Sequence, residues 1–197
     1  MKSRFKKYTD TLAGKKYMLF DYDSTIAKVP VDWLQARVDC RASLIALLPD
    51  LTIPEIARVD EMEAIALRHS PDSKDSIFRF RFDLECALDG GHEELPEVCE
   101  FILDLAQTGE FRFFIVSNNL NRTVVSGLKQ LGLSDVFEAI LGVDDVGQPK
   151  PETGAFTMLQ EFYGLSAGEC VFIGDNDRTD GGFCGALGIT FINITEN

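Results

Sequence analysis

The strongest constraint on how this chain folds is a series of short runs that are wholly or mainly apolar. A strand with one solvated face alternates apolar and polar residues, whereas a strand buried on both faces is apolar throughout. Strands of the second kind are typical of parallel sheets that helices cover on both sides. Five runs are continuous or nearly continuous in this sense and predict five such strands: 17–20, 111–116, 139–141, 170–173 and 189–194.

Helical patterns separate the later runs from one another. One pattern spans 95–106 and opens with Pro96, a residue suited to a first helical turn. A second begins at Asn121 and stops at Gly132, and a third begins at Pro151. Because strands and helices alternate along the chain, the pattern predicts an α/β fold with a doubly wound parallel sheet.

The stretch after the first run breaks this alternation, because it contains helical patterns and no convincing strand. Three amphipathic helices are predicted there, with apolar stripes at Trp33, Val38, Leu44 and Leu48, at Ile56, Val59, Met62 and Leu67, and at Ile77, Phe78, Leu84 and Leu88. We therefore expect two domains, an α/β core of residues 1–28 and 92–197 and an inserted α-helical cap of residues 29–91. The place of the insertion predicts a lid over the carboxyl end of the first strand.

Charge and composition narrow the classes of partner. The chain of 197 residues carries a formal charge of −13, so repulsion opposes binding to nucleic acid or to an anionic membrane. Its five cysteines form no Cys-x-x-Cys pair, which predicts reduced thiols rather than a zinc site or redox motif. We find no apolar segment long enough for a signal peptide or a membrane span, and therefore expect a cytoplasmic protein.

Polar side chains suited to catalysis follow the first four apolar runs. In an open parallel sheet, ligands bind beyond the carboxyl ends of the strands, where the loops converge. The candidates are Asp21 and Asp23 after the first run, Ser117 and Asn118 after the second, Lys150 beyond the third, and Asp175 and Asp180 after the fourth. The sequence thus predicts one crevice that holds several carboxylates, a hydroxyl group and an ammonium group.

Carboxylates held this close together repel one another, and some would take up protons unless a cation were bound. Magnesium is a hard ion that binds carboxylates, water and phosphate oxygens, so Mg²⁺ is the cofactor that this set of residues predicts. The same ion would attract an anionic phosphate into a protein of negative charge. A small phosphorylated metabolite is therefore the expected partner.

These residue types favour a phosphate-ester hydrolase with a covalent step. Asp21 can attack phosphorus as a nucleophile and form an acyl phosphate. Asp23, two residues later, can protonate the leaving oxygen and then deprotonate the attacking water. Ser117 and Asn118, with neighbouring backbone N–H groups, can bind the phosphoryl oxygens, and Lys150 can supply a fixed positive charge.

Four short motifs occur in order along the chain. They are Asp21-Tyr22-Asp23-Ser24-Thr25, then Ser117 behind an apolar strand, then Lys150 in Pro149-Lys150-Pro151-Glu152, then Gly174-Asp175 followed by Asp180. Together they resemble the motifs of the haloacid dehalogenase superfamily of phosphohydrolases. The resemblance implies a Rossmann-type core with a helical cap, and the inserted helices are similar to that cap in position and type.

The resemblance also implies a role for each matching residue. Asp21 would be the nucleophile and a magnesium ligand. Asp23 would be the acid and base and a ligand through its backbone carbonyl, and Asp175 would be the third protein ligand. Asp180 would lie in the outer metal shell or pair with Lys150.

A few residues fall outside these roles. Ser24 stands where glycine is more usual in the family, and Asp177 is an extra acid to which we assign no role. His69 and His92 stand in turn-like polar stretches and are expected to be solvated. Five cap arginines are expected at helix surfaces, although each could meet a second anionic group of a substrate: Arg37, Arg41, Arg68, Arg79 and Arg81.

Other functions remain open at this point. A dehalogenase of the same superfamily would not need the second aspartate, Asp23. A phosphotransferase or phosphomutase shares all four motifs and differs only in its acceptor. Outside the enzymes, the alternatives are a non-catalytic protein that binds a phosphorylated ligand and a phospho-acceptor of the response-regulator type, which lacks a large insertion.

Overall fold

A five-stranded parallel sheet lies at the centre of the protein, which confirms the fold predicted from the apolar runs. The computed structural model describes residues 5–88 and 90–195. The strand order is β5-β4-β1-β6-β7. The strands are β1 (Tyr17–Phe20), β4 (Arg112–Val116), β5 (Ala139–Leu141), β6 (Cys170–Gly174) and β7 (Thr190–Asn193).

Strand β1 lies in the middle of the sheet, between β4 and β6. Its last residue, Phe20, is level with Ile115 of β4 and with Ile173 of β6. The strand order reverses at β1, because later strands add first on one side of it and then on the other. A crevice opens beyond the carboxyl end of such a strand. Residues that follow Phe20 therefore enter the place where ligands bind in sheets of this kind.

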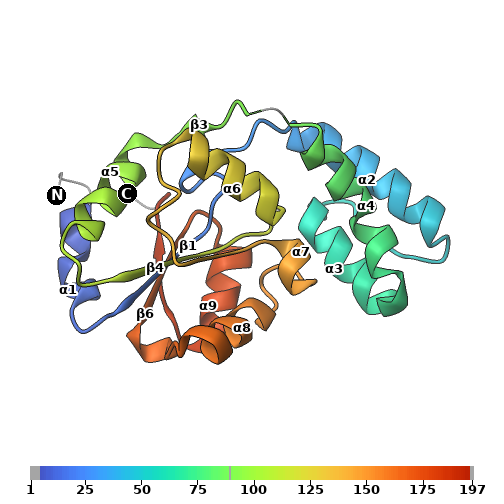
Figure 1. The fold of residues 1–197 in the computed structure, drawn as a ribbon. Helices are drawn as coiled ribbons and strands as arrows, with labels where there is room; N and C mark the ends of the chain where they lie inside the picture. Colours follow the sequence, from blue (N-terminus) through green and yellow to red (C-terminus); the bar gives the residue numbers. More distant parts are fainter. Residues whose placement is uncertain (1–4, 89, 196–197) are drawn as a thin grey trace.

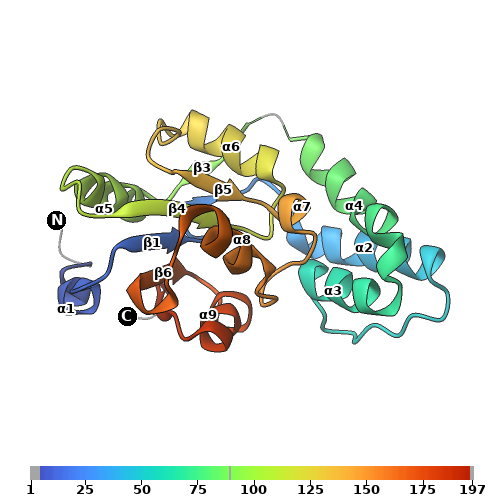
Figure 2. The same cartoon turned by 60° about the horizontal axis from the view of Figure 1, so that its bottom comes forward.

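Helices cover both faces of the sheet, because successive side chains of a strand point to opposite faces. The covering helices are α5 (Pro96–Ala106), α6 (Asn121–Gln130), α8 (Gly154–Tyr163) and α9 (Gly182–Leu187). Met18 and Phe20 pack in the cluster that includes α5 and α6, whereas Leu19 packs in the cluster that includes α8 and α9. Figures 1 and 2 show these two pairs of helices on opposite sides of the sheet.

Shorter elements complete the fold. They are α1 (Thr9–Leu12), α7 (Val143–Val146), 3₁₀ turns at Phe5–Tyr8, Pro71–Ser73 and Ala167–Glu169, and a π-helical turn at Asp177–Gly181. Helix α8 begins at Gly154 and not at Pro151, because a turn intervenes. Within the described part of the chain, no helix has both the length and the apolar character needed to cross a membrane.

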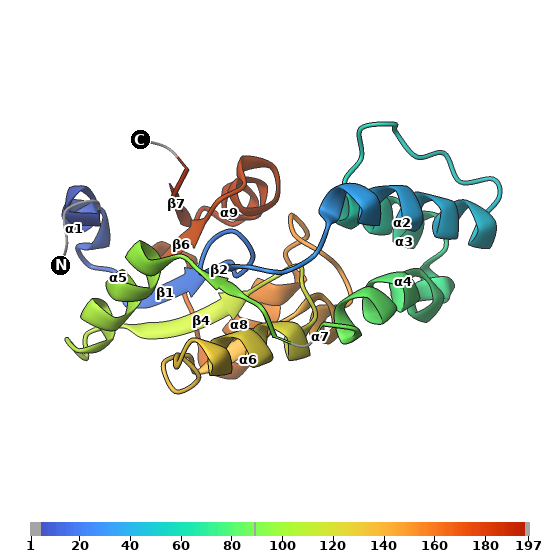
Figure 3. The same cartoon turned by 90° about the horizontal axis from the view of Figure 1, so that it is seen from above.

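Three helices stand to one side of the core, next to the carboxyl end of the sheet (Figure 3). They are α2 (Trp33–Leu47), α3 (Val59–His69) and α4 (Lys74–Cys86). They pack around their own apolar cluster, which includes Cys40, Met62 and Ile77. A two-stranded antiparallel pair, β2 (Ala27–Lys28) with β3 (Glu93–Glu94), joins them to the core.

The division into a core (residues 1–28 and 92–197) and a cap (residues 29–91) stays a prediction. The separate apolar cluster of the three helices and the strand pair at the proposed boundary support it. Residues 1–4, 89, 196 and 197 of this division lie outside the described residues.

The predicted apolar stripes of the cap are wrong at two positions. Val38 is 61% exposed, because the buried face of α2 is formed by Ala36, Cys40 and Leu44. Val38 lies two residues from both Ala36 and Cys40, which places it on the opposite side of a helix with 3.6 residues per turn. Ile56 is 75% exposed and precedes α3, which begins only at Val59.

Candidate active site

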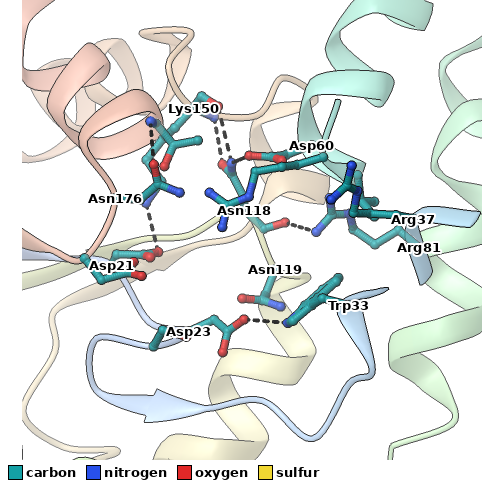
Figure 4. A pocket seen from close by; sticks show the side chains of 15 residues that line it. Asp21, Asp23, Trp33, Arg37, Asp60, Arg81, Asn118, Asn119, Lys150 and Asn176 are labelled. Carbon is teal, nitrogen blue, oxygen red and sulfur yellow. Dashed lines mark hydrogen bonds and ion pairs between the residues drawn. The ribbon is translucent and has the colours of Figure 1, made fainter. Parts of the chain in front are cut away.

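The polar residues that follow the strands converge on one pocket at the carboxyl end of β1 (Figure 4). The pocket has a volume of about 170 Å³. Five of the predicted site residues line it: Asp21, Asp23, Asn118, Lys150 and Asp175. The other two, Ser117 and Asp180, are buried and are not among the residues that line the pocket. The tertiary structure thus brings five of the seven nominated residues to one pocket, Asp180 joins them through its ion pair with Lys150, and Ser117 directly precedes the lining residue Asn118.

Three carboxylates gather around the ammonium group of Lys150. Carboxylate oxygens of Asp21, Asp175 and Asp180 lie within 4.8 Å of one another. Lys150 Nζ lies 2.8 Å from Asp21 Oδ1 and 2.7 Å from Asp180 Oδ1. Lys150 is only 4% exposed, so solvent screens these charges little. One buried cation therefore faces three acids, and the cluster keeps an excess of negative charge.

Burial, and after it the repulsion between neighbouring carboxylates, raises the pKa values of the acids. Burial, followed by the neighbouring Asp180, raises the pKa of Asp175 to about 6. Burial also raises the pKa of Asp180 to about 6, although Lys150 opposes that rise. Acids that retain protons in this way lack sufficient positive charge around them. A hard divalent cation such as Mg²⁺, which binds carboxylate oxygens, fits this set of donors.

Asp23 directs its carboxylate toward the start of the cap. Its Oδ1 accepts a hydrogen bond from Val29 N–H at 2.8 Å, and its Oδ2 accepts one from Trp33 Nε1–H at 2.9 Å (Figure 4). Burial raises the pKa of Asp23, while these two hydrogen bonds lower it in part. A carboxyl group with a raised pKa is suited to hold the proton that a leaving oxygen needs.

Backbone geometry explains the residue types at two positions near the site, Ser24 and Gly174. Ser24 has φ +60°, in the left-handed region that favours glycine. This conformation accounts for the glycine that is more usual at this place in the motif. A Cβ atom added at Gly174 would collide with the Asp180 carboxylate, so the absence of a side chain lets Asp180 approach the end of β6.

The loop after β6 is held by its own polar side chains. Asn176 Oδ1 accepts hydrogen bonds from the backbone N–H groups of Arg178 (3.0 Å) and Thr179 (3.4 Å). Asp177 Oδ1 accepts one from Asn193 Nδ2 at 2.7 Å. Asp177, which had no assigned role, therefore ties this loop to the end of β7.

The loop after β4 presents Ser117 and joins the loop that carries Lys150. Ser117 Oγ donates to Asn119 Oδ1 (3.2 Å) and accepts from Asn119 N–H (3.2 Å). Lys150 N–H donates to Asn118 Oδ1 at 2.7 Å. Asn118 Nδ2 donates to the Lys150 carbonyl (3.3 Å) and to Asp60 Oδ2 on α3 (3.1 Å). In this conformation the Asn118 amide binds protein groups from both core and cap.

The cap side of the pocket contributes residues that the sequence did not nominate as site residues. Trp33 and Arg37 come from α2, and Arg58 and Asp60 come from the beginning of α3. Their types and spacing are those of ordinary helix residues. Only the packing of the cap against the core brings them near Asp21.

Two expectations about charged residues are wrong. Arg81 is 2% exposed and pairs with Glu63 at 2.6 Å, so it is not a helix-surface charge. The sequence did contain a signal, because Arg81 follows the buried Ile77 by four residues and so shares its helix face. His92 is buried rather than solvated, and its Nδ1 lies 2.9 Å from Tyr22 Oη.

The fold and the pocket define an α/β protein whose ligand site lies where the strand order reverses. A family model described as "Haloacid dehalogenase-like hydrolase" matches residues 18–194. The chain belongs to this family of hydrolases. The resemblance carried by the four motifs is thereby confirmed.

Individual relatives include proteins with different reactions. The chain is 27% identical over 175 residues to the pyrophosphatase PpaX of Listeria monocytogenes serotype 4a (strain HCC23), a match that covers 81% of this chain and 74% of that protein. The HAD phosphatase from Thermococcus onnurineus has a similar structure, with 22% identity, a TM-score of 0.57, and coverage of 92% of this chain and 87% of that one. The 2-haloacid dehalogenase from Pseudomonas syringae pv. Tomato DC3000 also has a similar structure, with 21% identity, a TM-score of 0.56, and coverage of 91% of this chain and 86% of that one. Because one fold serves both reactions, side chains must decide between them.

Proposed function

We propose that this protein is a magnesium-dependent phosphatase that hydrolyses a small phosphorylated metabolite through an aspartyl-phosphate formed on Asp21. The observation that carries the proposal is the cluster of three carboxylates around the buried Lys150 at the carboxyl end of β1. The presence of Asp23 in the same pocket supports a phosphatase over a dehalogenase, because phosphate transfer needs an acid and base beside the nucleophile. The similarity to PpaX supports the same class of reaction.

Asp21 and Asp175 are the side chains that would hold Mg²⁺ directly, with the backbone carbonyl of Asp23 as a further ligand. Asp180, which pairs with Lys150 at 2.7 Å, would lie in the outer shell of the ion. When bound, the ion supplies positive charge that neutralises phosphoryl oxygens and draws an anionic substrate into an acidic protein. Lys150 contributes a second positive charge at a fixed position. Asp21 and Asp180 raise the pKa of Lys150 by more than burial lowers it, so the amine stays protonated.

The side chains then divide the hydrolysis into two steps. A carboxylate oxygen of Asp21 attacks phosphorus, the bond from phosphorus to the leaving oxygen breaks, and Asp23 gives that oxygen a proton. Asp23 next takes a proton from water, which attacks phosphorus and releases the Asp21 carboxylate. Lys150 Nζ binds a phosphoryl oxygen during both steps, and Ser117 Oγ binds one when its proton turns from Asn119 Oδ1 to the substrate.

The cap side of the pocket favours a small substrate with a second anionic group. Arg37 and Arg58 line the pocket, and guanidinium groups bind phosphate and carboxylate oxygens well. A pocket of about 170 Å³ is smaller than the roughly 300–1,000 Å³ typical of sites for drug-sized ligands. Pyrophosphate, the substrate class in the name of PpaX, is therefore the first compound to test, followed by phosphoglycolate, sugar phosphates and nucleotides.

The test is phosphate release by the purified protein from pyrophosphate and from a panel of phosphorylated metabolites. We expect release with Mg²⁺, none with excess EDTA, and none from Asp21→Asn. Activity that survives in Asp21→Asn, or that a chelator leaves unchanged, would contradict the mechanism. Transfer of phosphate to an added sugar instead of to water would assign the protein to the phosphotransferases.

A further inference from the structure

A buried ionic network on the cap faces the loop that presents Ser117. It consists of Glu63 on α3 with Arg81 and Glu85 on α4, and each of these residues is at most 2% exposed. Arg81 Nε lies 3.0 Å from both carboxylate oxygens of Glu63, and Arg81 Nη2 lies 2.6 Å from Glu63 Oε2. Glu63 thus occupies one side of the guanidinium group. The remaining nitrogen, Nη1, and the Glu85 carboxylate bind groups of the core.

Both groups bind the loop that follows β4. Arg81 Nη1 donates to the carbonyl oxygen of Asn118 at 2.7 Å (Figure 4). Glu85 Oε2 accepts from Leu120 N–H at 2.9 Å, and Glu85 Oε1 accepts from Asn119 Nδ2 at 3.3 Å. Two cap side chains therefore hold three successive residues of a core loop, although they lie more than thirty positions away in the sequence.

Asn119 extends this network to Ser117. Its Nδ2 donates to Glu85, and its Oδ1 accepts the hydrogen bond from Ser117 Oγ. A side-chain amide whose nitrogen is bound to a carboxylate has its oxygen oriented as well, because the two atoms share one plane. Glu85 therefore sets where the Asn119 amide points, and Asn119 sets where Ser117 Oγ lies. When the Ser117 proton turns from Asn119 Oδ1 toward a phosphoryl oxygen, Oγ still accepts the hydrogen bond from Asn119 N–H and keeps its place.

The Glu85 carboxylate does more than fill space between the cap and the core, because it accepts hydrogen bonds. Apolar side chains of similar volume often replace buried ion pairs without loss of stability, so packing alone does not require charge here. An apolar side chain could not, however, accept hydrogen bonds from Leu120 N–H and Asn119 Nδ2. Those two donors would be left buried and unpaired, and the loop would lose the contacts that orient it.

We propose that Glu85 is a positioning residue for Ser117, acting through Asn119, so that the cap completes the phosphate-binding loop of the core. The role rests on the phosphatase function proposed above. It makes the active site dependent on contact between cap and core, because the loop is fully held only when α4 lies against it.

A double-mutant cycle in kcat/KM tests this role. Glu85→Gln keeps the size of the side chain but turns one acceptor into a donor that faces other donors. We expect it to lower kcat/KM about tenfold in the wild-type background and less than about twofold in a Ser117→Ala background, because residues that act through one another are not additive. The inhibition constant of inorganic phosphate should rise in parallel, which a loss of stability alone would not cause.

Asp83→Asn is the matched control. Asp83 is an exposed carboxylate on the same helix, paired with Arg79 at 2.9 Å, and its loss should leave kcat/KM unchanged. If Glu85→Gln does not fold, as judged by circular dichroism, Asn119→Ala takes its place in the cycle under the same criterion. Equal fold-losses in the two backgrounds, or no loss, would overturn the positioning role and leave the phosphatase proposal intact. A wild-type protein that releases no phosphate from any compound overturns both.

Discussion

Two buried clusters of charge lie side by side in this molecule, and they differ in how fully their acids are matched by donors. They are the core cluster (Asp21, Lys150, Asp175 and Asp180) and the cap cluster (Glu63, Arg81 and Glu85). Each contains a single basic side chain and more than one carboxylate. The core cluster has three carboxylates to one base and the cap cluster has two, so acids outnumber the base in both.

The cap cluster is closed. The planar guanidinium group of Arg81 donates from Nε and Nη2 to Glu63 and from Nη1 to a carbonyl oxygen. Glu85 receives a backbone N–H and an amide N–H in addition. The core cluster is open, because Lys150 divides its ammonium group between Asp21 and Asp180. Carboxylate oxygens that lack enough hydrogen-bond donors, and not buried charges as such, therefore indicate where a cation would bind.

Replacing Lys150, the basic side chain of the core cluster, should have the largest effect on activity. We expect Lys150→Met to lower kcat/KM by about 10³-fold, because a positioned charge that binds the reacting phosphoryl group is lost. Phosphate release measured against substrate concentration checks this. Activity within tenfold of wild type would show that Lys150 is a structural partner of Asp21 and Asp180, like Arg81 in the cap.

Replacing Arg81, the basic side chain of the cap cluster, should instead reduce the stability of the fold. We expect Arg81→Met to lower the free energy of unfolding by about 3 kcal/mol, since it leaves Glu63 buried without its partner. Replacing both residues, with Glu63→Leu added, should recover much of that loss. Urea denaturation of the single and double variants measures both values. A single variant as stable as wild type would mean that the cap cluster is not closed in solution.

Magnesium should act on one cluster and not on the other. We expect saturating Mg²⁺ to stabilise the wild-type fold by about 2.7 kcal/mol at one hundred times its Kd, because the ion binds only the folded state. The shift in Tm should disappear in Asp175→Asn and persist in Arg81→Met, provided that the latter still folds. A Tm that Mg²⁺ does not change in the wild type would contradict a metal site at the core cluster.

The pH dependence of stability should be a smaller effect with a defined sign. The pKa values of Asp175 and Asp180 in the folded protein are raised to about 6, so this state holds protons that the unfolded chain releases. Their contribution to stability is present at low pH and is lost as pH rises through about 6. In EDTA, Asp175→Asn should therefore gain stability relative to wild type as pH rises from about 4 to about 6. Tm values for both proteins over this range test the sign, and a difference that does not change with pH would contradict it.

The strands and the nominated site residues were predictable because local patterns encode them. An uninterrupted run such as Tyr17–Phe20 is typical of a strand buried on both faces, and parallel strands bring their carboxyl ends to one edge. Asp21, which follows that strand, and Asp175, which follows β6, were therefore expected together. The cap was harder to predict, as Val38 shows, because short helices with apolar residues on several sides do not reveal which side packs.

The order of strands and helices could be inferred from the sequence, because each element depends on residues within a few positions of one another. The same order indicated the edge of the sheet where the site lies and the residues that follow the strands there. The bond from Trp33 to Asp23, the burial of Glu85 and the contact of the cap with the loop of Ser117 follow from how the cap packs against the core. The physical reason is that a charged side chain is buried only where distant groups complete its hydrogen bonds. Those partners are a property of how the cap and the core pack together.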